Sequence, residues 1–298
     1  MLVFPLLDET IIATLLAPIS ASFVSLSNLS WMATTYLIGM SASNPLSGHL
    51  ADVLGRRSCL MASVTIFITG ALICGLSTRL WILLLGRSIQ GFASGIMRSV
   101  VSFIETDLVT VRNRGITEAV GGILFGVCLA VGGLYGGGIN DTIGWKWSFL
   151  IQAPITVVLA VGAWFITRIP RRKSDISSLR RLSYVGGIAI LLAIVLFQLG
   201  LQSGGNTHSW KSPLVLTSLP LSLVAFAIFL VWDLCFAKEP IVPIRLLQHR
   251  SLYLSSLFCL FNLMSYFTIE FYIAIYLQEK EWINKVQLVL YAIALNGI

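Results

Sequence analysis

A few charged side chains inside long apolar runs are the residues of this sequence best suited to chemistry. Asp8 lies in the first run, Arg87 and Arg98 lie in the fourth, and Glu270 lies in the last. An ionisable group at membrane depth is costly and is a functional candidate by default. A carboxyl group held away from water resists ionisation and can exchange a proton near neutral pH. Asp8 is therefore a candidate proton site, although so few residues precede it that it could also lie near an aqueous mouth.

The fourth run carries a polar stripe. At about 100° per residue, Arg98 is offset by about 20° from Arg87, and Glu105 returns to the same helix face. This stripe should face the protein interior rather than lipid, because charges avoid hydrocarbon. Arg98 could line a substrate cavity, bind an anion or pair with Glu105. Gln90 is a further candidate for lining that cavity.

Two polar residues of the last long run are also candidate cavity groups. Glu270 lies among aromatic residues that could assist binding of a cationic substrate, and Asn262 lies two turns earlier. The alternative for Glu270 is a buried hydrogen bond to a neighbouring helix.

The composition indicates the elements that must position these residues. The chain has 298 residues, of which 56% are hydrophobic and only 11% are charged. A soluble domain carries about 25% charged residues, so this chain is predicted to be an all-α membrane protein. A spanning helix needs about 20 apolar residues. Nine candidate spans are 2–19, 31–51, 59–77, 81–104, 115–138, 148–168, 184–202, 213–235 and 251–277, and a tenth run, 286–298, is too short.

The basic residues indicate the orientation of the chain. The net charge of +7 could suggest nucleic acid, but the basic residues sit in short loops between apolar runs. Thirteen of the 20 Lys and Arg residues fall in loops after even-numbered spans, and the largest group is in the basic linker 169–183 and its flanks. The positive-inside rule therefore predicts that these loops and the N-terminus are cytoplasmic.

The loop after the second span contains a candidate cytoplasmic gate. It reads Gly48-His-Leu-Ala-Asp52-Val-Leu-Gly55-Arg56-Arg57. Gly55 permits a tight reversal between helices, and Asp52 with the Arg pair could latch the cytoplasmic side. The plainer alternative for the Arg pair is a positive-inside anchor.

This string resembles the loop-two signature of the major facilitator superfamily. Residues 85–91 (Leu-Gly-Arg-Ser-Ile-Gln-Gly) resemble the family's helix-four motif, and residues 7–12 (Leu-Asp-Glu-Thr-Ile-Ile) resemble the helix-one motif of its fourteen-helix drug:proton antiporter branch. Residues 145–149 (Trp-Lys-Trp-Ser-Phe), followed by Pro154, are similar to a further segment of that branch. Segments 204–213 and 239–246 are similar to fungal members, which include vacuolar basic amino acid transporters and multidrug or toxin exporters.

The resemblance implies a proton-coupled transporter of small organic substrates. It implies a proton-coupling role for Asp8 and Arg87 and alternating access by rocking of two helix bundles. The chain departs from the family at Gly133, where the helix-five motif has proline, and at Gln152, where the family has Asn. The glycines expected to allow close helix packing are Gly122, Gly126, Gly132, Gly133, Gly136 and Gly137.

The domain expectation follows from the same resemblance. We expect an N-terminal six-helix bundle over 1–168, a basic cytoplasmic linker over 169–183, an extra helix pair over 184–235, and the first helix of an incomplete C-terminal bundle over 236–298. Because family members have fourteen helices, a truncated gene product is expected, and a transport-inactive fragment is the alternative to a transporter. Efflux of drugs or toxins from the plasma membrane competes with vacuolar transport of basic amino acids.

Other functional classes have little support in the sequence. No Gly-x-Ser-x-Gly, His-Glu-x-x-His or Walker-type loop occurs, so we predict no enzyme activity and an ion gradient as the energy source. The five cysteines lie in or beside apolar runs without metal-ligand spacing, so we expect no metal, cofactor or disulfide framework. Partners should be protons, a small organic substrate and the lipid bilayer. Asn28 begins a glycosylation sequon of low expected occupancy.

Overall fold

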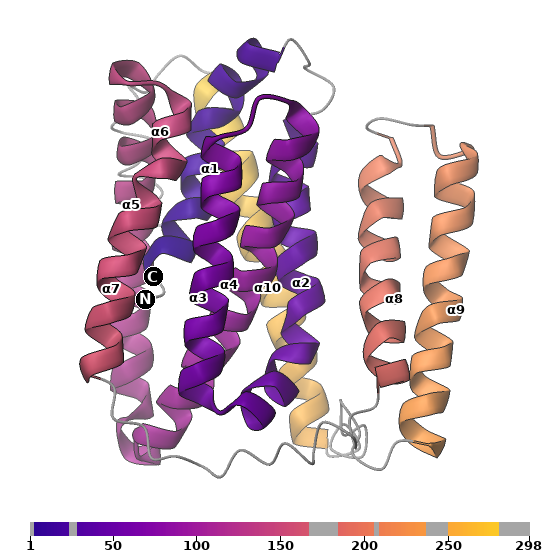
Figure 1. Ribbon diagram of the computed structural model, residues 1–298. Coiled ribbons are helices and arrows are strands. Elements are labelled where there is room, and N and C mark those ends of the chain that lie inside the picture. The colour runs from indigo at the N-terminus through magenta and orange to yellow at the C-terminus, as the bar shows by residue number, and fades with distance from the viewer. Residues whose placement is uncertain (1–2, 24–28, 167–183, 206–208, 237–249, 280–298) are drawn as a thin grey trace.

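The structure is a computed structural model that describes residues 3–23, 29–166, 184–205, 209–236 and 250–279. The linker 169–183 and the run 286–298 lie outside these ranges. Within them, each of the nine predicted spans contains a helix (Figure 1). The helices are α1 (Val3–Phe23), α2 (Leu29–Leu54), α3 (Arg56–Gly75), α4 (Leu80–Leu108), α5 (Arg114–Thr142), α6 (Trp145–Leu150), α7 (Gln152–Ile166), α8 (Tyr184–Ser203), α9 (Pro213–Cys235) and α10 (Arg250–Glu279), with a short 3₁₀ turn at Val111–Asn113.

The sixth predicted span is divided into two helices at a single residue, Ile151, whose φ of −68° and ψ of −29° remain helical, so the division is slight. α6 ends at Leu150 and α7 begins at Gln152. The physical reason is Pro154, which has no N–H to donate to the carbonyl of Leu150 and whose ring crowds that carbonyl. The interruption places the side chain of Gln152 at the first turn of α7.

Helices α1 to α7 form one bundle (Figure 1), in which α4 packs between α2 and α3 and α5 lies along α1. Two apolar clusters hold the bundle together. One joins α2, α3 and α4 around Phe67, Met97 and Ile104, and the other joins α1, α4 and α6 around Ile11, Leu83 and Phe149. The second cluster surrounds the buried charges described below.

Glycines bring α2 and α4 together. A Cβ on Gly91 of α4 would overlap the backbone of Tyr36, and a Cβ on Gly39 of α2 would lie 2.8 Å from the backbone nitrogen of Phe92. Side chains at these positions would separate the two helices, so glycine sets their distance. The same kind of contact joins α5 to α1, because Gly132 and Gly136 face Thr10 and Thr14.

The remaining predicted packing glycines behave differently. A Cβ on Gly122, Gly126 or Gly137 meets nothing within 4 Å among the described residues, so the expected close packing is not met there. The surroundings of Gly133 lie outside the description. These glycines lie on α5, which faces outward over much of its length.

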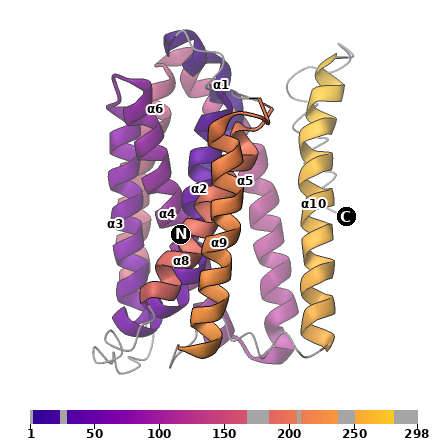
Figure 2. The same cartoon turned by 90° about the vertical axis from the view of Figure 1, so that its right-hand side faces the viewer.

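Helices α8 and α9 form an antiparallel pair beside the bundle, and α8 contacts α2 (Figure 1). Helix α10 runs along the outside of the bundle (Figure 2), and residues 250–265 are all exposed. Five helical segments of the described chain are long and apolar enough to cross a membrane by length and composition. They are Arg56–Gly75, Leu80–Leu108, Trp145–Phe165, Val185–Ser203 and Pro213–Cys235. Large apolar side chains on their outer faces, such as Val158 and Phe165, suit contact with lipid.

Candidate functional site

A buried ion pair lies at the centre of the bundle. Nη1 of Arg87 on α4 donates to Oδ2 of Asp8 on α1, and the two side chains are 1% and 0% exposed. The N-terminal end of α1 lies near mid-height of the bundle (Figure 1). The structure thus brings the two predicted proton-coupling residues into direct contact.

Two glutamines complete the polar contacts of this pair. Nε2 of Gln152 on α7 donates to Oδ1 of Asp8 at 3.2 Å, and Arg87 Nη1 also lies 3.2 Å from Oε1 of Gln90. The thiol of Cys74 on α3 donates to the same Gln90 oxygen at 3.4 Å. Gln90, which was predicted to line a substrate cavity, lies fully buried beside the ion pair.

Aromatic rings cover the guanidinium group. Cζ of Arg87 lies 4.4 Å from the ring centroid of Tyr36 and 5.9 Å from that of Phe149. The hydroxyl of Tyr36 donates to Oγ of Ser94 at 2.7 Å and also lies 3.2 Å from the carbonyl oxygen of Pro5. The rings exclude water and attract the cation through their π faces, so they hold Arg87 against Asp8.

The cluster contains polar atoms that have no hydrogen-bond partner among the described residues. They are Nε of Arg87, Nε2 of Gln90, Oε1 of Gln152 and Oγ of Ser148. A buried unpaired donor or acceptor costs about 1–3 kcal/mol. Unpartnered polar atoms are uncommon in protein interiors, so these atoms support treating the region as a candidate functional site.

The predicted gate residues lie near the C-terminal end of α4, whereas Arg87 lies near the N-terminal end of that helix. Arg56 forms an ion pair with Asp107 on α4, donates to the carbonyl of Phe103 and lies 5.7 Å from that residue's ring. The partner of Arg56 is therefore a carboxylate that sequence reasoning missed, while Asp52 is exposed. Gly55 adopts a φ of 80°, which favours glycine and permits the reversal between α2 and α3.

Arg57 of the same loop contacts α7. It donates to the carbonyl of Trp164, and its guanidinium carbon lies 3.8 Å from the Trp164 ring centroid. Arg56 and Arg57 thus tie the α2–α3 loop to α4 and to α7, respectively. Gly48 lies on α2 about two turns before this loop, and a Cβ there would lie 4.0 Å from the ring of Phe103.

The two members of the Arg56–Asp107 pair should differ in their effect on stability. Asp107 is 48% exposed, so Asp107→Asn should lower the free energy of unfolding by less than about 1 kcal/mol. Arg56 is 16% exposed and also contacts the carbonyl and ring of Phe103, so Arg56→Ala should cost more. Thermal unfolding of the purified variants, with exposed Arg112→Ala as the control, measures both. Equal losses for Asp107→Asn and Arg56→Ala would contradict this assignment.

The other predicted cavity residues do not join the buried pair. Nη1 of Arg98 lies 3.6 Å from the sulfur of Met40 on α2, and Asn262 is exposed on α10. The side chain of Glu270 and the sequon residue Asn28 lie outside the description.

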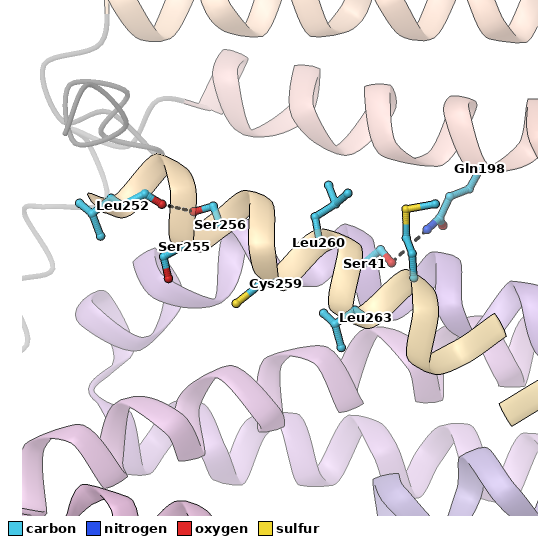
Figure 3. A pocket seen from close by; sticks show the side chains of 9 residues that line it. Ser41, Gln198, Leu252, Ser255, Ser256, Cys259, Leu260 and Leu263 are labelled. Carbon is cyan, nitrogen blue, oxygen red and sulfur yellow. Dashed lines mark hydrogen bonds between the residues drawn. The ribbon is translucent and has the colours of Figure 1, made fainter. Parts of the chain in front are cut away.

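An open pocket of about 1030 Å³ lies between α2, α8 and α10 (Figure 3). Across it, Nε2 of Gln198 on α8 donates to Oγ of Ser41 on α2 at 3.0 Å. Of the predicted cavity residues whose side chains the structure describes, Gln90, Arg98 and Asn262 do not line this pocket. Its lining residues are Ser41, Gln198, Leu252, Ser255, Ser256, Cys259, Leu260, Leu263 and Met264.

Sequence reasoning missed several residues of the central cluster. Tyr36, Ser94 and Cys74 were not singled out, and Gln152 was noted only as a departure from the family. One signal was present, because a hydroxyl or amide within an apolar span must find a partner inside the protein. That rule does not say which helix supplies the partner.

The fold and the buried pair define a helical membrane protein whose spans surround a charged centre. The chain belongs to the Major Facilitator Superfamily, because the family's sequence model matches residues 2–298. It is 32% identical over 257 residues to a vacuolar membrane amino acid uptake transporter of Schizosaccharomyces pombe, covering 86% of this chain and 44% of that protein. It is 32% identical over 273 residues to an efflux pump of Dothistroma septosporum, with 91% and 47% covered.

A bacterial relative extends this comparison. A multidrug transporter of Bacillus subtilis is 30% identical over 264 residues, which cover 89% of this chain and 47% of that protein. The chain spans about half the length of the curated relatives it matches. The predicted family and the helical membrane fold are therefore confirmed.

Proposed function

We propose that this chain carries the proton site of a transporter that moves small organic substrates across a membrane by alternating access. The observation that carries the proposal is the buried contact of Asp8 with Arg87 and Gln152. A carboxylate held by a cation and an amide inside a helix bundle can bind and release a proton, and each change alters the charge balance of the pair. That change of charge supplies the coupling between proton movement and the rearrangement of α1, α4 and α7.

The substrate class is proposed from the relatives. The relatives include an amino acid uptake transporter, an efflux pump and a multidrug transporter, so an amino acid and a drug are both candidate substrates. Among these we propose basic amino acids and cationic drugs, in line with the sequence resemblance. Vacuolar uptake and efflux at the plasma membrane remain the two candidate settings. The location of a tagged protein in the cell distinguishes them.

The orientation and the gate are part of the same proposal. We place the N-terminus and the Arg-rich loops in the cytoplasm, which makes the Arg56 end of the bundle the cytoplasmic end. There, Arg56 and Arg57 hold the α2–α3 loop to α4 and α7. Opening of a cytoplasmic gate would require these contacts to loosen. The domain boundaries proposed from the sequence, with a six-helix bundle over 1–168, accompany this assignment.

Asp8→Asn should abolish the response of transport to a pH gradient, because the amide cannot take up and release the proton. Sealed vesicles containing the chain are given an imposed pH gradient, and uptake of labelled lysine and of the cationic dye ethidium is measured. Uptake by Asp8→Asn should fall to the level without a gradient, while Asp141→Asn, at the exposed end of α5, should retain it. Full gradient-driven uptake by Asp8→Asn would refute the proton site.

A further inference from the structure

Gln152 holds the one carboxylate oxygen of Asp8 that Arg87 leaves free. Arg87 takes Oδ2, and Nε2 of Gln152 donates to Oδ1 at 3.2 Å. Both side chains that hold the carboxylate are at least 99% buried, as is the carboxylate itself. The ionised form of Asp8 is therefore satisfied by two different helices, α4 and α7.

The other end of the Gln152 amide is unused. Its Oε1 is buried and has no hydrogen-bond partner among the described residues. The nearby hydroxyl of Thr156 donates to the main-chain carbonyl of Gln152, at 2.7 Å, and not to this oxygen. Nε2 of this amide donates a hydrogen bond, whereas Oε1 accepts none from the described residues. Such an amide suits a partner that accepts a hydrogen bond in one state and donates one in another.

Protonation of Asp8 makes that change. A carboxylate only accepts hydrogen bonds, whereas a protonated carboxyl group also donates one. Among the described groups near Asp8, the other amide oxygen, Oε1 of Gln90, already accepts from Arg87 and Cys74. Arg87 has donors only, Cys74 and Tyr135 lie nearby as thiol and phenol, and the Tyr36 hydroxyl is turned to Ser94 and Pro5.

We propose that Gln152 is a positioning residue that serves both protonation states of Asp8 by rotating its side-chain amide. With Asp8 ionised, Nε2 donates to Oδ1. When a proton binds Oδ1, a half-turn about the terminal torsion presents Oε1 to the new O–H group. That torsion is soft, so the rotation requires no movement of α7. The proton adds to Oδ1 and no other covalent bond forms or breaks.

The inference rests on the proposed proton site and is tested without transport. Infrared difference spectra of the purified chain in lipid are recorded against pH, and Asp8→Asn identifies the Asp8 carboxyl band. The midpoint of this band in Gln152→Leu should move to higher pH by about half a unit to one unit, because the lost bond to the charged carboxylate is stronger than the lost bond to the neutral carboxyl group. The wild-type difference spectrum should also contain a side-chain amide band that Gln152→Leu lacks.

Two further variants make the test specific. Gln152→Asn keeps an amide and should retain the amide band, with a midpoint between those of wild type and Gln152→Leu. Gln198→Leu removes the α8 glutamine that donates to Ser41 on α2 and should leave the midpoint unchanged. If Gln152→Leu does not fold, the unbranched Gln152→Met takes its place.

Each contrary outcome has a distinct meaning. An Asp8 band that does not titrate would refute the proposed proton site itself. A titrating band whose midpoint is the same in Gln152→Leu, or moves equally in Gln198→Leu, would overturn the role of Gln152 alone. A shifted midpoint without an amide band in the wild-type spectrum would overturn the rotation.

Discussion

Replacing Arg87 with leucine should lower the free energy of unfolding by about 3–5 kcal/mol, because it leaves the Asp8 carboxylate buried without its cation. Asp8 is 0% exposed, and among the described residues only the Gln152 amide would still donate a hydrogen bond to it. Thermal unfolding of the purified protein in one detergent measures the loss. Arg112→Leu, at an exposed position outside the bundle, is the matched control and should change the unfolding midpoint little.

The double variant separates the pair from simple loss of packing. Asp8→Asn with Arg87→Leu removes both charges, so the cost of an unpaired buried charge disappears. The double variant should therefore recover most of the stability that Arg87→Leu loses. If the two single losses simply add in the double variant, the two side chains are not energetically coupled and the pair does not act as a unit.

Gly91→Ala should destabilise the bundle by about 1–3 kcal/mol, although alanine is the better helix former. The new Cβ would overlap the backbone of Tyr36 on α2, and a backbone cannot move aside as a flexible side chain can. Separation of α2 from α4 would also displace the Tyr36 ring, which covers Arg87. The same variant should therefore lose gradient-driven uptake in the vesicle assay.

At Gly122, replacement by alanine should have the opposite effect on the free energy of unfolding. A Cβ there meets nothing within 4 Å in the described part of the chain, so Gly122→Ala should be neutral or stabilise α5 by up to about 1 kcal/mol. Thermal unfolding of the two variants side by side gives the comparison. Similar losses at Gly91 and Gly122 would show that helix spacing is not the cause.

Much of the fold could be predicted because its signal is local. Runs of about 20 apolar residues can satisfy their backbone in a bilayer only as helices, so each predicted span contains a helix in the described ranges. The interruption of the sixth span could not be located from apolarity alone. It depends on Pro154, which leaves the carbonyl of Leu150 without its helical partner, and on tertiary contacts nearby, such as the Tyr135 hydroxyl, which donates to the carbonyl of Ser148 at 3.3 Å.

The candidate site was predictable only in part. Asp8 and Arg87 stand out in the sequence because a charged side chain within an apolar span is energetically costly and is therefore a functional candidate. Their companions do not stand out, since a tyrosine, a cysteine or a glutamine in a span is common enough to have many explanations. Arg56 illustrates the same limit, because its carboxylate is Asp107, 51 residues away along the chain.

The sequence by itself determined that this protein is a bundle of membrane helices, that it belongs to a transporter family, and that Asp8 and Arg87 are its costly charges. Only the tertiary structure decided that these charges meet and that Gln152 holds the free oxygen of the carboxylate. The physical reason is the distance along the chain over which each kind of interaction acts. Apolarity and helix periodicity act over neighbouring residues, whereas the pairing of buried polar groups depends on how separate helices pack, and glycines such as Gly91 set that packing at the level of single atoms.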